Sequence, residues 1–532
     1  IKKRFSQNLW MELQENSIKF IIIHPILIAL YPVFFVYSQN IHLILIQGII
    51  FPVLIILGIT IAMWAITRSI LKNTRKSALL TSLFVFLFFS YGHIFNILES
   101  NSNQEYYFLI HTFLLITYAL IAIFSTYYLV KTPTKLNNIT TLANVISITL
   151  VSFVLFNIGT TNFENFSTYQ DEMQPPIVLE NDFENLPDVY YIVLDEYAPL
   201  RTLNMFYDYD NSHFIKFLQE RGFFVTKNSH SNYAQTFLAT ASTLNMKNVN
   251  FLSDIVGKES LDQRIPYEMI SNNIVMKNFK GIGYEIYNFD SGWWGTRNLQ
   301  ISDVNLCSKN QNMDFHTLYK LKETSILRVF DIFIKDPSAK IFHQERRDRI
   351  LCQFDDITKI KYGTEKPVFV FMHVMAPHDP YVFGPNGEEV NYKYTFGPTG
   401  NAYLDPSEEK IAYINQLTYL TKILEETIES LQENSDSAPV IIIQSDTGPN
   451  IGLSDTTTEL QQTSRMSIFN AYYFPNEEYN LLYDDITPVN SFRMVFDSQF
   501  QTNYGVVEDK IFFSTYEKPY TLIELNDLQI LN

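Results

Sequence analysis

The stretch DVYYIVLDEY, residues Asp188–Tyr197, decides the fold of the chain. Its apolar run from Val189 to Leu194 stops at two acids, Asp195 and Glu196. A short apolar run of this kind is typical of a parallel strand that is buried on both faces. In open α/β sheets, ligands bind at the carboxyl ends of the strands. We therefore expect Asp195 and Glu196 to lie at a ligand-binding edge of a sheet.

Two further runs repeat this pattern. PVFVFMH, residues Pro367–His373, leads into a proline-flanked loop that carries His378, and PVIIIQ, residues Pro439–Gln444, leads to Asp446. Strands that alternate with predicted helices indicate a mainly parallel, doubly wound α/β sheet. Because prolines restrict the loop around His378, we assign that imidazole a functional role, whereas we interpret His373 as structural.

A candidate nucleophile lies in SNYAQTFLATASTLNM, residues Ser231–Met246. The residues from Phe237 onward favour a helix, so Thr236 is predicted near a helix N-terminus. Free amides and the helix dipole favour negative charge there, which suits an alkoxide or a bound phosphate. The alternative interpretation is that Thr236 is a plain helix N-cap.

The first 158 residues have a different character. Five apolar stretches are each long enough to span a bilayer, which needs about 20 residues; they are residues 18–37, 42–66, 77–98, 106–130 and 139–158. Lys and Arg gather before the first stretch, between the second and third, and between the fourth and fifth. By the positive-inside rule, the N-terminus is cytoplasmic and the C-terminal domain is extracytoplasmic, in a multi-pass protein of the cell membrane.

Charge separates the two parts of the chain. Residues 1–158 carry a net charge of +6 and residues 159–532 a net charge of −23. Such an acidic part is a poor partner for nucleic acid, which needs basic surface. Residues 159–187 are predicted to be a polar linker and residues 188–532 the soluble domain. The two cysteines, Cys307 and Cys352, either form one bridge or are two unrelated buried thiols.

Taken together and in this order, the motifs resemble the membrane-anchored branch of the alkaline phosphatase/sulfatase superfamily. This branch includes lipoteichoic acid synthase-like and phosphoethanolamine transferase-like proteins. The segments that carry the resemblance extend over nearly the whole soluble part: YYIVLDEY (190–197), SNYAQTFLATASTLNM (231–246), FVFMHVMAPHDPYVFGPNGE (369–388), IIIQSDTGP (441–449) and FNAYYFP (469–475).

The resemblance implies roles for particular residues. It implies that Asp195 and Asp446 are metal carboxylates, that Thr236 is both nucleophile and metal ligand, and that His378 lies on the substrate side. It further implies a central, mostly parallel sheet flanked by helices. The formylglycine motif of true sulfatases, C/S-x-P-x-R, is absent around Thr236, which favours a phosphate-type substrate.

The chain departs from the family pattern near the expected metal. The family has D-H-G after the last strand, whereas this chain has Asp446-Thr447-Gly448, and no histidine follows His378. Glu196 stands where glycine is common. Without imidazole ligands we expect one divalent metal, with Mn²⁺, Mg²⁺ or Ca²⁺ favoured over Zn²⁺ and with Thr447 and Glu196 as further candidate oxygen ligands.

We therefore expect a membrane-anchored hydrolase or transferase that acts on phosphate esters of envelope glycans or lipid headgroups. Trp293, Trp294 and Arg465 are further candidates for substrate contacts. The main alternative is a catalytically impaired pseudoenzyme of the same fold that binds an envelope glycan, lipid or protein. A second alternative is a structural or transport membrane protein whose helical bundle carries the function.

Overall fold

The computed structural model describes residues 21–41, 46–99, 106–133, 136–163, 186–308, 315–332, 337–390, 406–433, 435, 437–450 and 458–525. The chain forms two compact units. The helical unit comprises residues 1–163 and 311–336, and the α/β unit comprises residues 164–310 and 337–532. Residues 311–336, which we expected within the soluble domain, thus group with the helices. Most of the expected linker lies outside the described residues.

The helical unit contains long apolar helices. Its described helices are α2 (His24–Gln39), η1 (Ile46–Ile49), α3 (Ile50–Leu71), α4 (Thr74–Glu99), α5 (Tyr107–Lys131), α6 (Asn137–Phe163), α13 (Phe315–Glu323) and η5 (Ile326–Ile332). Among the described residues, four helices are long and apolar enough to cross a membrane: α3, α4, α5 and α6. Four of the five expected stretches are thus helices that could cross a membrane. The count of five is not confirmed, because α2 has only 16 described residues.

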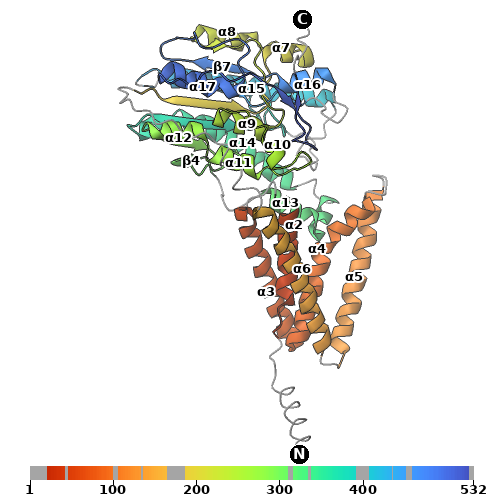
Figure 1. Ribbon diagram of the computed structural model, residues 1–532. Coiled ribbons are helices and arrows are strands. Elements are labelled where there is room, and N and C mark those ends of the chain that lie inside the picture. The colour runs from red at the N-terminus through yellow and green to blue at the C-terminus, as the bar shows by residue number, and fades with distance from the viewer. Residues whose placement is uncertain are drawn as a thin grey trace, which may run out of the picture. The chain divides into compact units, whose positions relative to one another are not determined.

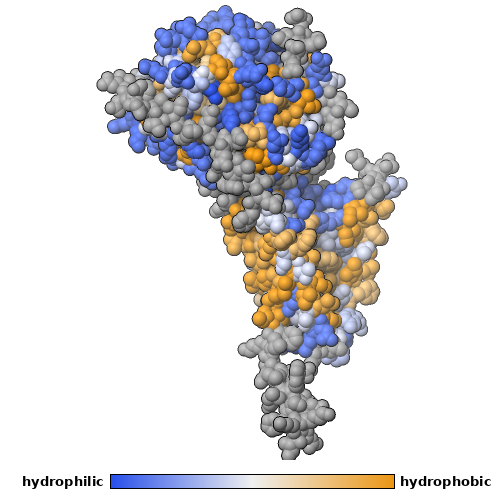
Figure 2. All heavy atoms as spheres, viewed as in Figure 1, coloured by the Kyte–Doolittle hydropathy of each residue, from blue (hydrophilic) through white to orange (hydrophobic). Residues whose placement is uncertain are grey.

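The outward faces of these helices suit a lipid environment. Large apolar side chains remain exposed along α3, α5 and α6, whereas α4 is the most enclosed of the four. Figure 2 shows the resulting apolar band along the helices. Because a helix satisfies its own backbone hydrogen bonds, such a surface is compatible with a bilayer.

The α/β unit is built on a seven-stranded sheet of order β2-β7-β6-β1-β5-β3-β4. Its strands are β1 (Val189–Leu194), β2 (Phe224–Val225), β3 (Glu285–Phe289), β4 (Val304–Leu306), β5 (Val368–Val374), β6 (Val440–Ser445) and β7 (Asn470–Tyr473). β7 is antiparallel to both of its neighbours, and the other pairings are parallel. β8 (Phe512–Phe513) and β9 (Ile523–Glu524) form a separate antiparallel pair. The predicted mostly parallel α/β sheet is confirmed.

Helices surround this sheet (Figure 1). They are α7 (Leu200–Thr202), η4 (Leu203–Tyr207), α8 (Ser212–Glu220), α9 (Thr236–Asn245), α10 (Leu252–Ile255), α11 (Arg264–Ser271), α12 (Ile274–Gly281), α14 (Pro337–Ile357), η6 (Ile360–Gly363), α15 (Pro406–Glu433), α16 (Glu459–Met466) and α17 (Pro488–Gln499).

The central strand β1 is buried on both faces, as its continuous apolar run predicts. Val189, Tyr191 and Val193 belong to a core that α9, α11, α12 and α17 complete. The alternate residues Tyr190, Ile192 and Leu194 belong to a second core with α8, α14 and α15. Side chains of a strand point to opposite faces in turn, so one strand serves both cores.

Candidate active site

Three neighbouring strands end at one edge of the sheet. Leu194, the last residue of β1, is paired with Val374 of β5 and with Ser445 of β6. Asp195 and Asp446 directly follow their strands, and His373 is the penultimate residue of β5. Because the three strands are parallel and adjacent, their carboxyl ends deliver these side chains to one place.

Asp195, His373 and Asp446 form a buried group that could hold a metal ion. Each offers one ligand atom, and these atoms all lie within 4.8 Å of one another. Asp195 Oδ1, His373 Nε2 and Asp446 Oδ2 are buried and have no hydrogen-bond partner among the described residues. A buried polar atom without a partner is destabilising, so three such atoms together indicate a ligand-binding site.

The surroundings of His373 prepare it as a ligand. Its Nδ1 lies 2.9 Å from Thr296 Oγ1, which leaves Nε2 for the cluster. Burial lowers the pKa of His373 to about 4, so the imidazole is neutral at neutral pH and retains a lone pair. An outer hydrogen bond of this kind orients a metal-binding imidazole. We expected a structural role for His373, and the structure also places its imidazole in this candidate cluster.

The carboxylates in the cluster repel each other. Burial, followed by the neighbouring Asp446, raises the pKa of Asp195 well above its ordinary value. A divalent cation would relieve both effects, since it compensates the buried negative charge. Two carboxylates and one imidazole are a donor set that suits Zn²⁺ or Mn²⁺. The expectation that disfavoured Zn²⁺ assumed that no imidazole is available, and His373 removes that premise.

The two further oxygen candidates differ. Thr447 is fully buried and its hydroxyl oxygen has no hydrogen-bond partner among the described residues, which fits a ligand or a donor at this site. The Glu196 carboxylate instead accepts a short hydrogen bond from Arg465 Nη1. The Glu196 backbone has a φ of 63°, a left-handed conformation that favours glycine, and such conformations gather at functional sites.

Arg465 lies within the site rather than on a strand. The composition of RMSIFNAYYF, residues Arg465–Phe474, predicts a strand, but α16 ends at Met466 and β7 begins only at Asn470. Arg465 is 1% exposed and also donates to the carbonyls of Ala234 and Gly448. Burial alone lowers the pKa of Arg465, but Tyr516, Glu196 and the two aspartates outweigh burial and raise it. Through these contacts Arg465 holds the loops of the site together. Its predicted contact with substrate stays a prediction.

His378 is half-buried beside Glu196. Its Nε2 lies 3.8 Å from Glu196 Oε1, and its Nδ1 lies 3.0 Å from Asp379 Oδ1. Burial on its own lowers the pKa of His378, but Glu196, Asp195 and Asp379 outweigh burial and raise it well above the ordinary value. The imidazole is therefore protonated at neutral pH. Sequence reasoning missed Arg346, whose guanidinium donates to the His378 carbonyl at 2.9 Å and fixes the loop.

Thr236 is the first residue of α9, and the N-cap is Gln235. The prediction of a helix N-terminus is confirmed, and the alternative of a plain N-cap is wrong. The preceding segment lies against the Asp446 loop, because Ser231 Oγ donates to the Asp446 carbonyl at 2.6 Å and Arg465 binds the Ala234 carbonyl. Thr236 itself is half-buried.

Comparison with known proteins places the chain in a family. A family model described as Sulfatase matches residues 191–514, which is more than half of the chain. The chain belongs to the sulfatase family. No curated protein matches it.

Solved structures resembling this sulfatase-family chain include phosphoethanolamine transferases. The C-terminal periplasmic domain of EcEptC from Escherichia coli is 13% identical, with a TM-score of 0.41, over 67% of this chain and 98% of that domain. The integral membrane lipooligosaccharide phosphoethanolamine transferase A from Neisseria meningitidis is 12% identical, with a TM-score of 0.38, over 89% of this chain and 94% of that protein. A structure of the Escherichia coli domain in complex with Zn is similar at a TM-score of 0.40, over 66% of this chain and 96% of that domain, and 12% identity.

The tryptophan pair of this sulfatase-family chain lies in the loop after β3. The Trp293 ring meets the His373 ring edge-on, with centroids 5.7 Å apart. Trp294 stacks with the Arg297 guanidinium, which lies 5.2 Å from the ring centroid. Trp293 therefore packs against the imidazole of His373, a candidate metal ligand. A substrate contact by either tryptophan stays a prediction.

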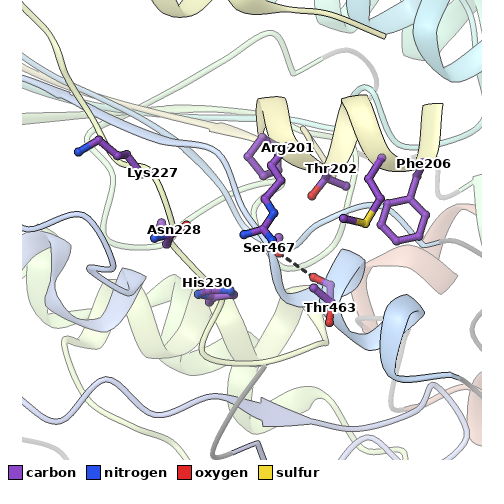
Figure 3. Close-up of a pocket in the computed structure, with 11 residues that line it drawn as sticks. Arg201, Thr202, Phe206, Lys227, Asn228, His230, Thr463 and Ser467 are labelled. Atoms are coloured by element: carbon purple, nitrogen blue, oxygen red, sulfur yellow. Dashed lines mark hydrogen bonds between the residues drawn. The ribbon is translucent and has the colours of Figure 1, made fainter. Parts of the chain in front are cut away.

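A hollow in the α/β unit is lined by segments that also build the site. It lies between the chain after β1, the chain after β2 and the end of α16. Figure 3 shows the Arg201 guanidinium directed toward Thr463 and Ser467, with His230 nearby and Lys227 pointing away. Burial lowers the pKa of His230 to about 4, so its imidazole is neutral at neutral pH. Sequence reasoning missed this hollow, because its residues are scattered along the chain.

Proposed function

We propose that this sulfatase-family chain is a membrane-anchored enzyme that transfers or hydrolyses phosphate esters of an envelope glycan or a lipid headgroup. Thr236 is the nucleophile, and Asp195, His373 and Asp446 hold a divalent metal. The observation that carries this proposal is the buried group of Asp195, His373 and Asp446. Their ligand atoms lie within 4.8 Å of one another, and each residue has a buried polar atom without a hydrogen-bond partner among the described residues. His373 also removes the main argument for a pseudoenzyme, which was the lack of an imidazole ligand.

A bound divalent metal would neutralise phosphoryl charge and lower the pKa of the nucleophilic hydroxyl. The donor set of two carboxylates and one imidazole leaves coordination positions open, as catalytic sites require. Thr447 offers a further buried oxygen. We propose Zn²⁺ or Mn²⁺ as the ion, because an imidazole nitrogen binds these better than it binds Mg²⁺ or Ca²⁺.

Thr236 and His378 carry the proposed steps of the reaction. Thr236 releases its hydroxyl proton to solvent, and the resulting alkoxide Oγ1 attacks phosphorus at the N-terminus of α9, where the helix dipole favours the negative charge. The bond from phosphorus to the leaving oxygen breaks, and that oxygen takes the proton from His378 Nε2. An acceptor hydroxyl or water then gives its proton to His378 and attacks phosphorus, and Thr236 leaves as the alkoxide that began the cycle. The raised pKa of His378 means that this proton is present at neutral pH.

The orientation in the membrane follows from the loops. Arg68, Lys72, Arg75 and Lys76 lie at the connection of α3 and α4, and Lys131 lies at the end of α5. By the positive-inside rule, these ends are cytoplasmic, so the α/β unit faces the outer side of the cell membrane. The substrate is therefore an outward-facing lipid headgroup or envelope glycan.

The first prediction concerns Thr236. In the full chain, reconstituted in lipid nanodiscs and loaded with metal, Thr236→Ala should lower hydrolysis of a nitrophenyl phosphodiester by at least about 1000-fold, because the covalent step is lost. Thr240→Ala is the matched control, since Thr240 lies one turn further along α9 and is buried.

Equal turnover by the two variants would contradict the assignment of the nucleophile. A chelator should abolish the activity of the natural chain, and Zn²⁺ or Mn²⁺ should restore it. The natural chain is then tested on a panel of phosphodiesters and phosphomonoesters with Mn²⁺, Mg²⁺, Ca²⁺ and Zn²⁺. If it binds these esters but turns over none of them, the pseudoenzyme is the better description.

A further inference from the structure

The segment that leaves the α/β unit is attached to the end of α4. The chain departs after β4, contributes α13 and η5 to the helical unit and returns as α14. Gly92 of α4 donates its amide to the Thr324 carbonyl at 3.2 Å. A Cβ at Gly92 would lie 2.0 Å from the Glu323 carbonyl oxygen. The segment thus approaches α4 so closely that only glycine fits there.

Arg328 holds η5 in a defined orientation. It is 9% exposed, and its guanidinium lies 4.4 Å from the centroid of the Phe95 ring. It donates to Glu99 Oε2 at 2.8 Å and makes a short hydrogen bond to Asn96. Two acids, Glu99 and Glu323, balance its charge. One face of η5 is therefore fixed against the last turns of α4.

The same level of the bundle carries exposed apolar side chains. Tyr91 of α4 lies 2.8 Å from His111 Nδ1 of α5, so the end of α4 lies beside the start of α5. Ile97 near the end of α4 is 64% exposed, and Phe108 near the start of α5 is 65% exposed. Both helices are long and apolar enough to cross a membrane. This end of the bundle therefore lies at a boundary between bilayer and water.

The other face of η5 also carries exposed apolar side chains. Leu327 is 41% exposed and Phe330 is 52% exposed. They are three residues apart in a 3₁₀-helix, whose 3.0 residues per turn place them one above the other. Buried Arg328 stands between them and faces the bundle. An exposed apolar pair next to lipid-facing helices is typical of an element that lies in the membrane interface.

We propose that η5 is a membrane-interface anchor, with Leu327 and Phe330 immersed in the lipid bilayer beside α4 and α5. The occupant of this face is lipid, because Ile326 and Val329 on the inner side of η5 pack against the apolar cluster of α4 and α5, two helices that are themselves apolar enough to cross a membrane. The anchor ties the polypeptide that enters and leaves the α/β unit to the level of the lipid headgroups. This inference is independent of the proposed catalysis.

The test is to label single cysteines at Leu327→Cys and Phe330→Cys in the full chain in phospholipid nanodiscs. Cys307 and Cys352 are bonded to each other, so the introduced thiol takes the spin label. Power-saturation spectroscopy then compares collisions with oxygen, which concentrates in lipid, and with a water-soluble nickel chelate. Phe108→Cys is the lipid-facing control, and Val506→Cys, which is 56% exposed in the α/β unit, is the water-facing control.

The oxygen-to-nickel ratio at both η5 positions should match that at Phe108 and clearly exceed that at Val506. A ratio equal to that at Val506 would overturn the proposal. Spectral broadening that disappears when labelled chain is diluted with unlabelled chain would show that a second copy covers the face, and would also overturn it. The two positions are scored separately, so a variant that fails to fold leaves the other as a test.

Discussion

Arg465 connects three segments that come from distant parts of the chain. Its guanidinium group bonds Glu196 after β1, the Ala234 carbonyl before α9 and the Gly448 carbonyl after β6. These segments also carry Asp195, Thr236 and Asp446. A planar group with five donors can satisfy several acceptors at once, which lysine cannot do. Arg465 therefore links the segments that carry the proposed catalytic and metal-binding side chains.

Removal of Arg465 should destabilise the α/β unit strongly. Arg465→Met deprives the buried Glu196 carboxylate of its arginine partner, and breaking a buried pair lowers the free energy of unfolding by about 3–5 kcal/mol. The matched control is Arg221→Met, which breaks the more exposed pair with Glu429 and should lower it by less than about 1 kcal/mol. Urea unfolding followed by tryptophan fluorescence measures both. Equal losses of unfolding free energy in the two variants would show that the Arg465–Glu196 pair contributes no more to stability than an exposed ion pair does.

His373 should contribute directly to metal affinity. His373→Ala removes the imidazole from the buried cluster, and the affinity for Zn²⁺ or Mn²⁺ should fall by more than about 100-fold, beyond the loss typical of an outer hydrogen-bond partner. His378→Ala is the control, because His378 contacts Glu196 rather than the cluster, and it should lower turnover while metal affinity stays nearly unchanged. Calorimetric titration of the full chain gives both affinities. Unchanged affinity in His373→Ala would return His373 to a purely structural role.

At the scale of elements, α4 and the segment of α13 and η5 depend on a close backbone contact. The Gly92 amide bonds the Thr324 carbonyl, and Leu321 of α13 packs into the apolar cluster of α2 and α4. Packing of this kind leaves no space for an added methyl group. The segment is thus positioned by backbone shape as well as by the charge of Arg328.

Gly92→Ala should loosen the attachment of this segment. The new methyl group would collide with the Glu323 carbonyl, and overpacking of this kind typically costs about 1–3 kcal/mol. Amide hydrogen exchange should become faster in residues 315–332. Gly58→Ala is the control, because a Cβ at Gly58 of α3 meets no atom within 4 Å, and exchange should stay unchanged there. If amide exchange in residues 315–332 of Gly92→Ala is as slow as in the natural chain, the segment tolerates a wider separation from α4.

At the scale of the whole molecule, a disulfide closes the excursion of the chain. Cys307 follows β4, Cys352 lies in α14, and their sequence separation of 45 spans the residues that join the helical unit. Of the two interpretations that the sequence left open, the bridge is the one found. A cross-link over such a loop restricts the unfolded chain and so stabilises the folded one.

Loss of this bridge should lower the stability of the α/β unit. Loop-closure entropy for this separation predicts about 4 kcal/mol, and measured values for disulfides are typically about 2–4 kcal/mol. Urea unfolding with and without a reductant measures the difference. A double variant, Cys307→Ser with Cys352→Ala, should already be less stable and should not respond to the reductant. A natural chain that is insensitive to the reductant would show that the thiols are not bridged in solution.

The sequence by itself determined the features that depend on local pattern. Continuous apolar runs specified β1, β5 and β6, and the acid at the end of β1 and β6 marked the site, because parallel strands deliver their ends to one edge. Length and apolarity specified four of the five expected spans. The composition around Thr236 correctly predicted the start of α9, since helix termini have local signatures.

Only the tertiary structure decided which distant residues meet. His373 resembles any core histidine in sequence, and it becomes a candidate ligand because β5 is the neighbour of β1 and because Thr296 occupies its other nitrogen. Arg465 was predicted on a strand, because RMSIFNAYYF has strand-like composition, yet α16 extends to Met466 and buries the guanidinium against Glu196. The membership of residues 311–336 in the helical unit depends on the shape around Gly92. Each of these features is a contact between segments far apart in the chain, and a local pattern carries no information about such partners.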